Sequence, residues 1–387
     1  GNTYQEVLDS LKNGKSGITA NETYKQMGFR SQVSGSIDLN LSELIDRKLY
    51  RFMGESAAYA YLAAQDAIEM AGISELHLNS ERAGIVAGSG GASTRVMVST
   101  ADITREKGPK RIGPYAVTKS MGSSISAILA TAYKLKGINY SISSACATSA
   151  HCIGHGADLI KSGQQDIVMA GGGEDLHWSS SSLFDAMGAL SSNFNDNPSA
   201  ASRAYDRNRD GFVISGGSGM LILEDEEHAK KRNANILAKL TGYYATSDGY
   251  DMVAPSGEGA LRCMKGAMQN HGSKVDYINT HGTSTPVGDV AELKAIKELF
   301  KNDMPVISST KSMTGHSLGA TGVQEAIYAI MMLREKFIAP SINIDELCDE
   351  ADGLNITTQT LEKNIDSVLS NSFGFGGTNA SLVISRY

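Results

Sequence analysis

The chain contains 387 residues, which at about 150 residues per domain allows two or three domains or one large duplicated unit. Its 41 glycines, 7 prolines and 4 cysteines exclude collagen, disordered chains and disulfide-rich secreted scaffolds. A glycine excess without proline indicates tight turns in an ordered fold. The formal net charge of −7 argues against a nucleic-acid-binding protein.

Targeting signals are sparse as well. No apolar run approaches the ~18 residues of a membrane span, and no charged-then-apolar leader opens the chain. We therefore expect a cytoplasmic protein that binds neither nucleic acid nor membrane. The sequence begins at Gly1 rather than Met, which leaves a preceding or excised segment open.

Strands and helices are predicted to alternate along the first part of the chain. In order, the pattern predicts a helix at 4–13, a helix at 54–71, a strand at 85–87 running into glycines at 88–91, a strand at 138–143, a helix at 148–161, a strand at 166–170 running into glycines 171–173, a strand at 220–224 and a helix at 225–232.

The second part repeats this rhythm. It predicts a strand at 236–240, a helix at 256–269, a strand at 276–279, a helix at 287–300, a strand at 306–308, a helix at 320–334, and final strands at 368–371 and 381–385. The alternation predicts an α/β fold with largely parallel buried sheets. Both parts carry a strand that runs into a glycine cluster, which suggests two related halves, 1–233 and 234–387.

Cys146 is the first candidate for chemistry. It follows a predicted strand, lies among small residues and comes just before a predicted helix. The positive end of a helix lowers the pKa of a thiol and so favours a nucleophilic thiolate. The competing interpretation is a buried structural cysteine, which is how we interpret Cys152 inside the same helix.

A histidine-centred segment is the second candidate. His281 ends a strand, the hydroxyls of Thr283 and Thr285 flank it, and Asp289 and Glu292 follow at i and i+3 on the next predicted helix. A lone histidine is usually structural. One that lies between a strand end, glycine and hydroxyls favours function.

Two further segments also contain candidate functional residues. Lys311 and His316 lie between a strand and a helix, where the lysine would orient a carboxylate or simply be solvated. Phe375 lies in a glycine-rich stretch whose exposed N–H groups suit an oxyanion hole, or else form a plain hairpin. The glycine clusters lack both nucleotide-binding patterns. No Cys/His spacing indicates zinc, so His151 and His155 are interpreted as structural.

Together these segments resemble the β-ketoacyl-[acyl-carrier-protein] synthases, the condensing enzymes of fatty-acid synthesis. The resemblance extends over most of the chain and includes residues 113–115, 141–150, 184–191, 202–212 and 254–259. Residues 141–150 and 252–259 are most similar to the bacterial type I members, and 215–219 depart from the type II pattern. The family usually opens with an apolar strand and a V-T-G-x-G turn, which this chain lacks; we interpret that as missing leading residues, without which the first sheet would lose a strand.

The resemblance implies a thiolase-type fold of two halves stacked in five layers, α-β-α-β-α, usually as a homodimer. It implies that Cys146 is the nucleophile, that His281 and His316 stabilise the enolate of a malonyl group, and that Lys311 orders the site. Phe375 would be the gate, its N–H joining that of Cys146 in the oxyanion hole. The other implied roles are acidic second-layer residues (Asp289, Glu292) and pantetheine contacts (Thr283, Thr285).

The implied reaction is decarboxylative condensation of malonyl-acyl carrier protein with an acyl group on Cys146, with no metal or cofactor. The acyl pocket is expected at Gly90, Gly91 and Met121. Because carrier proteins are acidic and this chain is also net acidic, docking needs a local basic patch. The candidates for this patch are Lys48, Arg51, Lys107, Lys110 and Arg111.

Several alternatives stay open. The same fold also serves type II synthases and polyketide ketosynthases. A degradative thiolase would need a second cysteine in the glycine-rich turn at 371–379, which has none. A cysteine peptidase would match the 146-to-281 spacing, but its local motif is absent. A partner subunit that only sets chain length would lack the nucleophile, whereas Cys146 is present.

Overall fold

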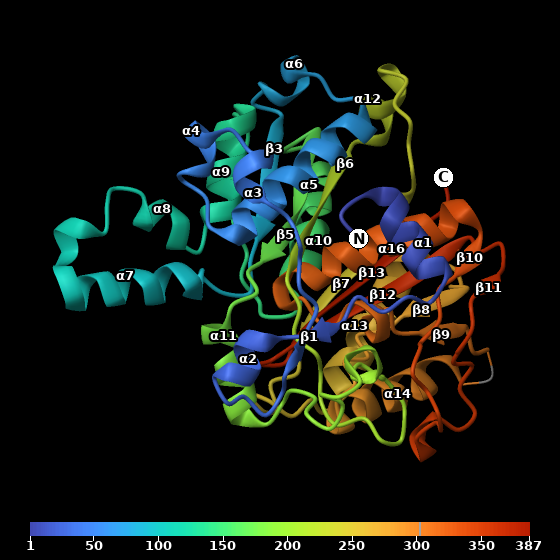
Figure 1. Cartoon of the computed structure of the whole chain (residues 1–387). Coiled ribbons are helices and arrows are strands. Elements are labelled where there is room, and N and C mark those ends of the chain that lie inside the picture. Colours follow the sequence, from blue (N-terminus) through green and yellow to red (C-terminus); the bar gives the residue numbers. More distant parts are fainter. Residues whose placement is uncertain (302) are drawn as a thin grey trace.

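The computed structural model describes residues 1–301 and 303–387. Within these residues, two main mixed sheets form (Figure 1). The first sheet has the order β4-β3-β5-β6, with β4 Asn139–Tyr140, β3 Ala83–Gly88, β5 Ile167–Glu174 and β6 Gly217–Glu224. The second has the order β7-β13-β12-β8-β9, with β7 Lys239–Ser247, β13 Thr378–Ser385, β12 Ser367–Gly374, β8 Tyr277–Asn279 and β9 Val306–Ser308.

Helices cover both sheets and also separate them. The outer face of the first sheet carries α5 Glu55–Ala71 and α9 Ser124–Tyr133, and the outer face of the second carries α13 Glu258–His271 and α14 Pro286–Phe300. Between the sheets lie α10 Thr148–Lys161 and α16 Thr321–Glu335, which contact each other and strands of both sheets. The predicted five-layer α-β-α-β-α arrangement is therefore confirmed (Figure 1).

The central layer depends on glycine in α10. A Cβ at Gly154 would lie 2.2 Å from the ring of Tyr243, and one at Gly156 would lie 3.0 Å from a methyl of Val168. Glycine at these positions therefore lets the helix approach both sheets. Around it, apolar residues from both halves form one large core, while two smaller cores lie beneath the outer helices.

The remaining elements lie outside these layers or connect them. They are α1 Tyr4–Lys12, β1 Thr19–Ala20, α2 Glu22–Gln26, β2 Val33–Ser34, α3 Leu41–Leu44, α4 Arg47–Tyr50, α6 Glu75–Leu78, α7 Thr94–Lys107, α8 Ala116–Ser120, α11 Trp178–Met187, α12 Glu226–Lys231, α15 Lys311–Thr314, β10 Phe337–Ile338 and β11 Leu361–Glu362, with 3₁₀ turns at Pro109–Arg111, Pro198–Ala200, Leu318–Ala320 and Asp349–Ala351.

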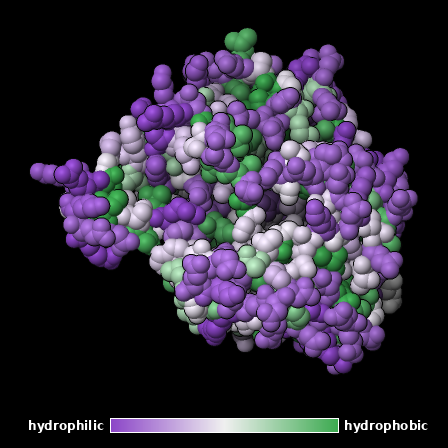
Figure 2. All heavy atoms as spheres, in the orientation of Figure 1, coloured by the Kyte–Doolittle hydropathy of each residue, from purple (hydrophilic) through white to green (hydrophobic). Residues whose placement is uncertain are grey.

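The helices α7 and α8 form an arm that projects from the body (Figure 1). Every residue of α7 is at least partly exposed. Met97 on α7 is 56% exposed and Val117 on α8 is 73% exposed. Figure 2 shows apolar residues among hydrophilic ones on this arm. An amphipathic helix normally buries one face, so the arm presents apolar surface for a further contact.

Most predicted elements match the structure within a few residues, but several predictions are wrong. The strand predicted at 236–240 lies at Lys239–Ser247, and only Asn139–Tyr140 of 138–143 is a strand. Antiparallel pairs β5–β6, β12–β13 and β7–β13 make both sheets mixed rather than largely parallel. The helices α7, α9 and α11 were not predicted.

The glycines at 171–173 continue β5 instead of forming a turn. A Cβ at Gly172 would lie 2.5 Å from the Gly88 carbonyl oxygen, and one at Gly173 would lie 2.5 Å from the Ser56 carbonyl oxygen. Glycine here therefore serves close approach between backbones, which a local sequence pattern does not distinguish from a turn.

Within the described part of the chain, β6 pairs only with β5 and forms an edge of the first sheet. A groove of about 1590 Å³ runs beside this edge, lined by residues near Gly1 and by α5, β6 and α16. The first sheet thus has four strands where the second has five, counted over the described residues. None of the helices formed by these residues is long and apolar enough to cross a bilayer.

Candidate active site

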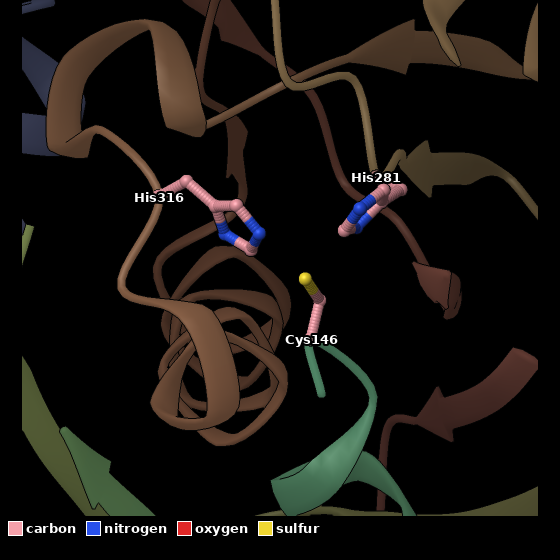
Figure 3. Close-up of side chains that lie close together, drawn as sticks. All are labelled: Cys146, His281 and His316. Carbon is pink, nitrogen blue, oxygen red and sulfur yellow. The ribbon is translucent and has the colours of Figure 1, made fainter. Parts of the chain in front are cut away.

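One thiol and two imidazoles converge between the two halves (Figure 3). Cys146 comes from the segment before α10, His281 follows β8, and His316 lies between α15 and α16. One donor atom from each lies within 4.8 Å of the other two. The imidazole rings meet edge to face, with centroids 5.3 Å apart. The structure therefore brings Cys146 together with two histidines that lie 135 and 170 positions further along the sequence.

Cys146 lies on a sharp turn. The preceding Ala145 has a φ of +50°, a backbone conformation that costs energy for a residue with a Cβ. Thr148 stabilises this turn, since its hydroxyl accepts from the Ser144 N–H and contacts the Ala145 carbonyl. A Cβ at Gly374 would lie 3.1 Å from the Cys146 amide nitrogen, so glycine there lets the next loop reach the nucleophile.

Burial raises the pKa of the Cys146 thiol to about 12, although the charge of Lys311 acts in the opposite direction. A helix N-terminus is worth ~0.3–1 kcal/mol, which is less than one pKa unit at about 1.4 kcal/mol. The helix α10 therefore does not outweigh burial. The prediction of a lowered thiol pKa is wrong in direction, and the thiol needs a base at neutral pH.

Both histidines can act as that base because both are neutral. Burial and the charge of Lys311 hold the pKa of His281 and of His316 well below the usual value. The Nδ1 of His316 is 3.0 Å from the Thr321 hydroxyl oxygen. Its Nε2 is buried and has no hydrogen-bond partner among the described residues, as is true of the His281 Nδ1. These atoms are free to bond a substrate.

Lys311 is fully buried rather than solvated. Its Nζ lies 2.6 Å from Oε1 of Glu325 on α16, and both side chains are only 1% exposed. Burial raises the pKa of Glu325 to about 7, with Lys311 opposing that rise. This pair places a positive charge near the thiol and both imidazoles.

Asp289 and Glu292 share the buried face of α14, as predicted, and both hold the loop after β8. Glu292 accepts from the N–H groups of His281 and Gly282, each at 2.8 Å. Asp289 accepts from the Ser284 N–H at 3.1 Å, and Ser284 has a strained φ of +73°. The hydroxyl oxygens of Thr283 and Thr285 lie 3.0 Å apart in this loop.

Phe375 occupies the tip of the hairpin between β12 and β13, so the hairpin interpretation and the amide-loop interpretation describe the same feature. The backbone amides of Phe375 and Cys146 act to lower the pKa of the thiol, against the larger effect of burial. The Phe375 side chain is 40% exposed, and its ring lies 6.4 Å from that of Phe184. Two amides and a partly exposed ring therefore meet at the sulfur.

Other predicted site residues lie farther out. Gly90 packs near Ala145, since a Cβ there would lie 3.5 Å from the Ala145 carbonyl oxygen, whereas a Cβ at Gly91 would meet open space. Met121 lies between α8 and α9, at the base of the arm. The exposed basic residues are distributed over α4 (Lys48), its C-terminal end (Arg51) and the arm (Lys107, Lys110, Arg111). Arg51 stacks 5.2 Å from the ring centroid of Tyr115, which joins the first group to the arm.

Sequence reasoning missed several residues that hold the site. Glu325 is the single acidic residue in the mostly apolar stretch 322–333 of α16, and that signal could have identified it. Asn371 on β12 donates to Glu292 at 3.1 Å, and Tyr205 donates its N–H to Asp289 at 3.1 Å. Thr321 contacts His316. Polar residues of this kind carry no local signal of which group they reach across the fold.

The three other thiols and the two histidines on α10 are structural. Cys152, Cys263 and Cys348 are buried free thiols, and His151 and His155 bond to Ser144 and Tyr140. The sequence reasoning found no cluster with metal-ligand geometry. The fold does assemble one from Cys146, His281 and His316, although the chemistry implied by the resemblance uses no metal.

A five-layer α/β fold, with a thiol that follows a strained backbone turn and two neutral imidazoles beside it, defines a thiolase-like protein. Comparisons with known proteins refine this class. The family model described as beta-ketoacyl synthase, N-terminal domain, matches residues 1–229, and the C-terminal domain model matches residues 237–345. The chain belongs to the β-ketoacyl synthase family, and it is an acyl-transferring condensing enzyme.

Named relatives fall into two groups. The chain is 59% identical to 3-oxoacyl-[acyl-carrier-protein] synthase 1 of Haemophilus influenzae and 58% identical to that of Escherichia coli, in each case over 100% of this chain and 96% of the relative. It is 37% identical to 3-oxoacyl-[acyl-carrier-protein] synthase 2 of Coxiella burnetii, over 100% of this chain and 95% of the relative.

Solved structures agree on the fold. A beta-ketoacyl synthase from Burkholderia phymatum has a TM-score of 0.94 at 30% identity, covering 100% of this chain and 96% of that one. A type II polyketide ketosynthase, described in complex with its acyl-carrier protein, has a TM-score of 0.90 at 30% identity, covering 99% of this chain and 95% of that one.

Proposed function

We propose that this chain is a type I 3-oxoacyl-[acyl-carrier-protein] synthase of fatty-acid elongation, with Cys146 as its nucleophile. The observation that carries this proposal is the convergence of Cys146, His281 and His316 within 4.8 Å. The higher identity to relatives named synthase 1 than to a relative named synthase 2 favours type I over type II and polyketide ketosynthases.

The first step transfers the acyl group to the enzyme. A neutral imidazole takes the thiol proton, and the Cys146 sulfur attacks the thioester carbonyl carbon of the acyl carrier protein. The negative oxygen that forms is held by the N–H groups of Cys146 and Phe375. The bond from the carbonyl carbon to the carrier's sulfur then breaks, and the carrier thiolate recovers a proton.

The second step uses malonyl carrier protein. The bond between the carboxylate and the malonyl carbon breaks, CO₂ leaves, and the electron pair becomes an enolate. Two imidazole N–H donors stabilise the enolate oxygen more than the ground-state thioester oxygen, and this difference lowers the barrier. The carbanion attacks the acyl-cysteine, a carbon–carbon bond forms, and the carbon–sulfur bond to Cys146 breaks. Cys146 leaves as a thiolate and takes up a proton from solvent, which restores the thiol.

The surrounding charges suit these steps. Burial, and second the charge of Lys311, keeps both histidines neutral, and Glu325 holds Lys311 in place. Asp289 and Glu292 hold the His281 loop by its backbone. We assign Thr283 and Thr285 to the pantetheine arm, and Gly90, Gly91 and Met121 to the acyl pocket.

We propose acyl carrier protein as the partner, docking on Lys48, Arg51, Lys107, Lys110 and Arg111. The arm supports a homodimer, since α7 and α8 expose apolar side chains such as Met97 and Val117. Two thiolase-like halves, 1–233 and 234–387, each provide one sheet.

Four free thiols support a reducing compartment, so we assign the protein to the cytoplasm.

Intact-mass measurement tests this function. After incubation with acyl-loaded carrier protein, the wild-type chain should gain one acyl group. Cys146→Ala should abolish this gain, whereas Cys152→Ala, which removes a buried thiol on the helix α10 that follows Cys146, should retain it. Adding malonyl carrier protein should discharge the acyl group and release CO₂. Loading without malonyl-dependent CO₂ release would indicate a hydrolase and overturn the proposal.

A further inference from the structure

Glu174, the last residue of β5, is a buried carboxylate that neither proposed step uses. Its side chain is 6% exposed. One oxygen accepts from the Ser89 hydroxyl at 2.7 Å, and the other accepts from the N–H groups of Gly90 at 2.8 Å and Gly319 at 3.0 Å. A buried carboxylate with three donors is fully engaged rather than incidental.

The donors belong to two separate loops. Ser89 and Gly90 follow β3, and Gly319 lies in the 3₁₀ turn between His316 and α16. The two loops meet backbone to backbone. A Cβ on Gly319 would lie only 2.3 Å from the Gly90 nitrogen, and a Cβ on Gly90 would lie 2.9 Å from the Glu174 oxygen. Two glycines therefore make room for one carboxylate to bond both.

Both loops lead to reacting groups. On one side, Gly90 packs near the carbonyl oxygen of Ala145, the residue before the nucleophile. On the other side, the turn that holds Gly319 connects His316 to Thr321, whose hydroxyl bonds His316. A shift of the Ser89–Gly90 loop would therefore move the wall of the proposed acyl pocket, and a shift of the turn that holds Gly319 would move the His316 imidazole.

We infer that Glu174 is a positioning residue, which sets the distance between the Gly90 wall of the acyl pocket and the His316 turn. This inference rests on the proposed function. This role depends on the shape and hydrogen bonds of the Glu174 side chain rather than on its charge. A negatively charged Glu174 raises the pKa of the Cys146 thiol, so its charge does not favour the nucleophilic thiolate. Burial raises the pKa of Glu174 to about 7, so a neutral side chain of the same shape suits the position.

Substitutions separate shape from charge. Glu174→Gln keeps one carbonyl oxygen for both amides and turns its NH₂ toward the Ser89 hydroxyl, so we expect condensation within about threefold of wild type. Glu174→Ala removes all three bonds. A misplacement of about 1 Å can cost 10²-fold in rate, so we expect kcat for condensation to fall about 100-fold and the acyl chain-length preference to change.

A matched control lies at the other end of the same strand pair. Glu224 on β6 pairs with Ile167 at the start of β5, and it bonds Arg232 rather than the site. Glu224→Ala should lower thermal stability without changing chain-length preference or kcat per folded molecule. Ser89→Ala, which removes a single donor, should shift chain-length preference in the same direction as Glu174→Ala, but less.

Hydrogen exchange gives a readout that does not depend on catalysis. Glu174→Ala should speed exchange at the Gly90 and Gly319 amides, and Glu224→Ala should not. Unchanged exchange there, or a Glu174→Ala enzyme with wild-type chain-length preference and kcat, would overturn the inference. If the wild-type chain fails to condense at all, the proposed function fails, while the exchange result still decides whether Glu174 holds the two loops.

Discussion

The buried pair Lys311–Glu325 allows one prediction to be worked through quantitatively. The Nζ and Oε1 atoms are 2.6 Å apart, so their gross attraction is on the order of 6 kcal/mol at an effective dielectric constant of about 20. Desolvation of both charges offsets much of this. Removing one partner leaves the other charge buried and unpaired, which typically costs about 3–5 kcal/mol.

The single variants Lys311→Met and Glu325→Leu should therefore both unfold early. Unfolding entropy of ~2.1 cal/mol/K per residue sums to about 0.8 kcal/mol/K for this chain, so the loss corresponds to about 4–6 °C in Tm. The double variant replaces the pair by apolar groups of similar size. It should melt within about 2 °C of wild type.

Activity should not follow stability in this series. The double variant lacks the positive charge that acts on Cys146, His281 and His316, so its condensation rate should stay low although its Tm recovers. Differential scanning calorimetry and malonyl-dependent CO₂ release measure the two properties. A double variant that melts as early as the single variants, or a single variant that melts like wild type, would refute the reasoning.

Other predictions concern the thiol, the imidazoles and the basic patch. Because burial raises the pKa of Cys146 to about 12, iodoacetamide alkylation should keep accelerating up to pH 9; a plateau near pH 7 would show a resting thiolate. Because the pKa values of His281 and His316 are lowered, the acid limb of kcat/KM should fall below pH 6.5, and a limb at 6.5 or above would contradict neutral imidazoles. Zinc should protect Cys146 from alkylation, and a chelator should reverse this, since the three donors lie within 4.8 Å; unchanged alkylation would exclude zinc binding. Reversing the charge of Lys48 and Arg51 should raise KM for carrier-bound substrates at constant kcat, and an unchanged KM would refute docking there.

Much of the fold and part of the site could be predicted from local sequence. The helix at Thr148–Lys161 and the strand at Val306–Ser308 lie where periodicity placed them. Cys146 and His281 were identified because each ends an extended segment beside small or hydroxyl-bearing residues. Such features depend on neighbours in the chain, so a sequence contains them directly.

Features set by distant partners were not predictable in this way. The glycines at 171–173 are strand rather than turn because Gly88 and Ser56 approach them from other segments. Glu325 was missed because its partner, Lys311, lies on another element. The thiol pKa was predicted in the wrong direction, since burial by both halves outweighs the local helix.

The sequence by itself determined the kind of chemistry: one thiol, two imidazoles, an amide loop and a family resemblance that the comparisons support. Only the tertiary structure decided how these groups act. Packing of α10 and α16 between two sheets places the site inside the protein, and burial disfavours the charged forms of the groups within it. That desolvation keeps the thiol protonated and the imidazoles neutral, and it buries Lys311 and Glu174 as groups that hold the site rather than as solvated charges.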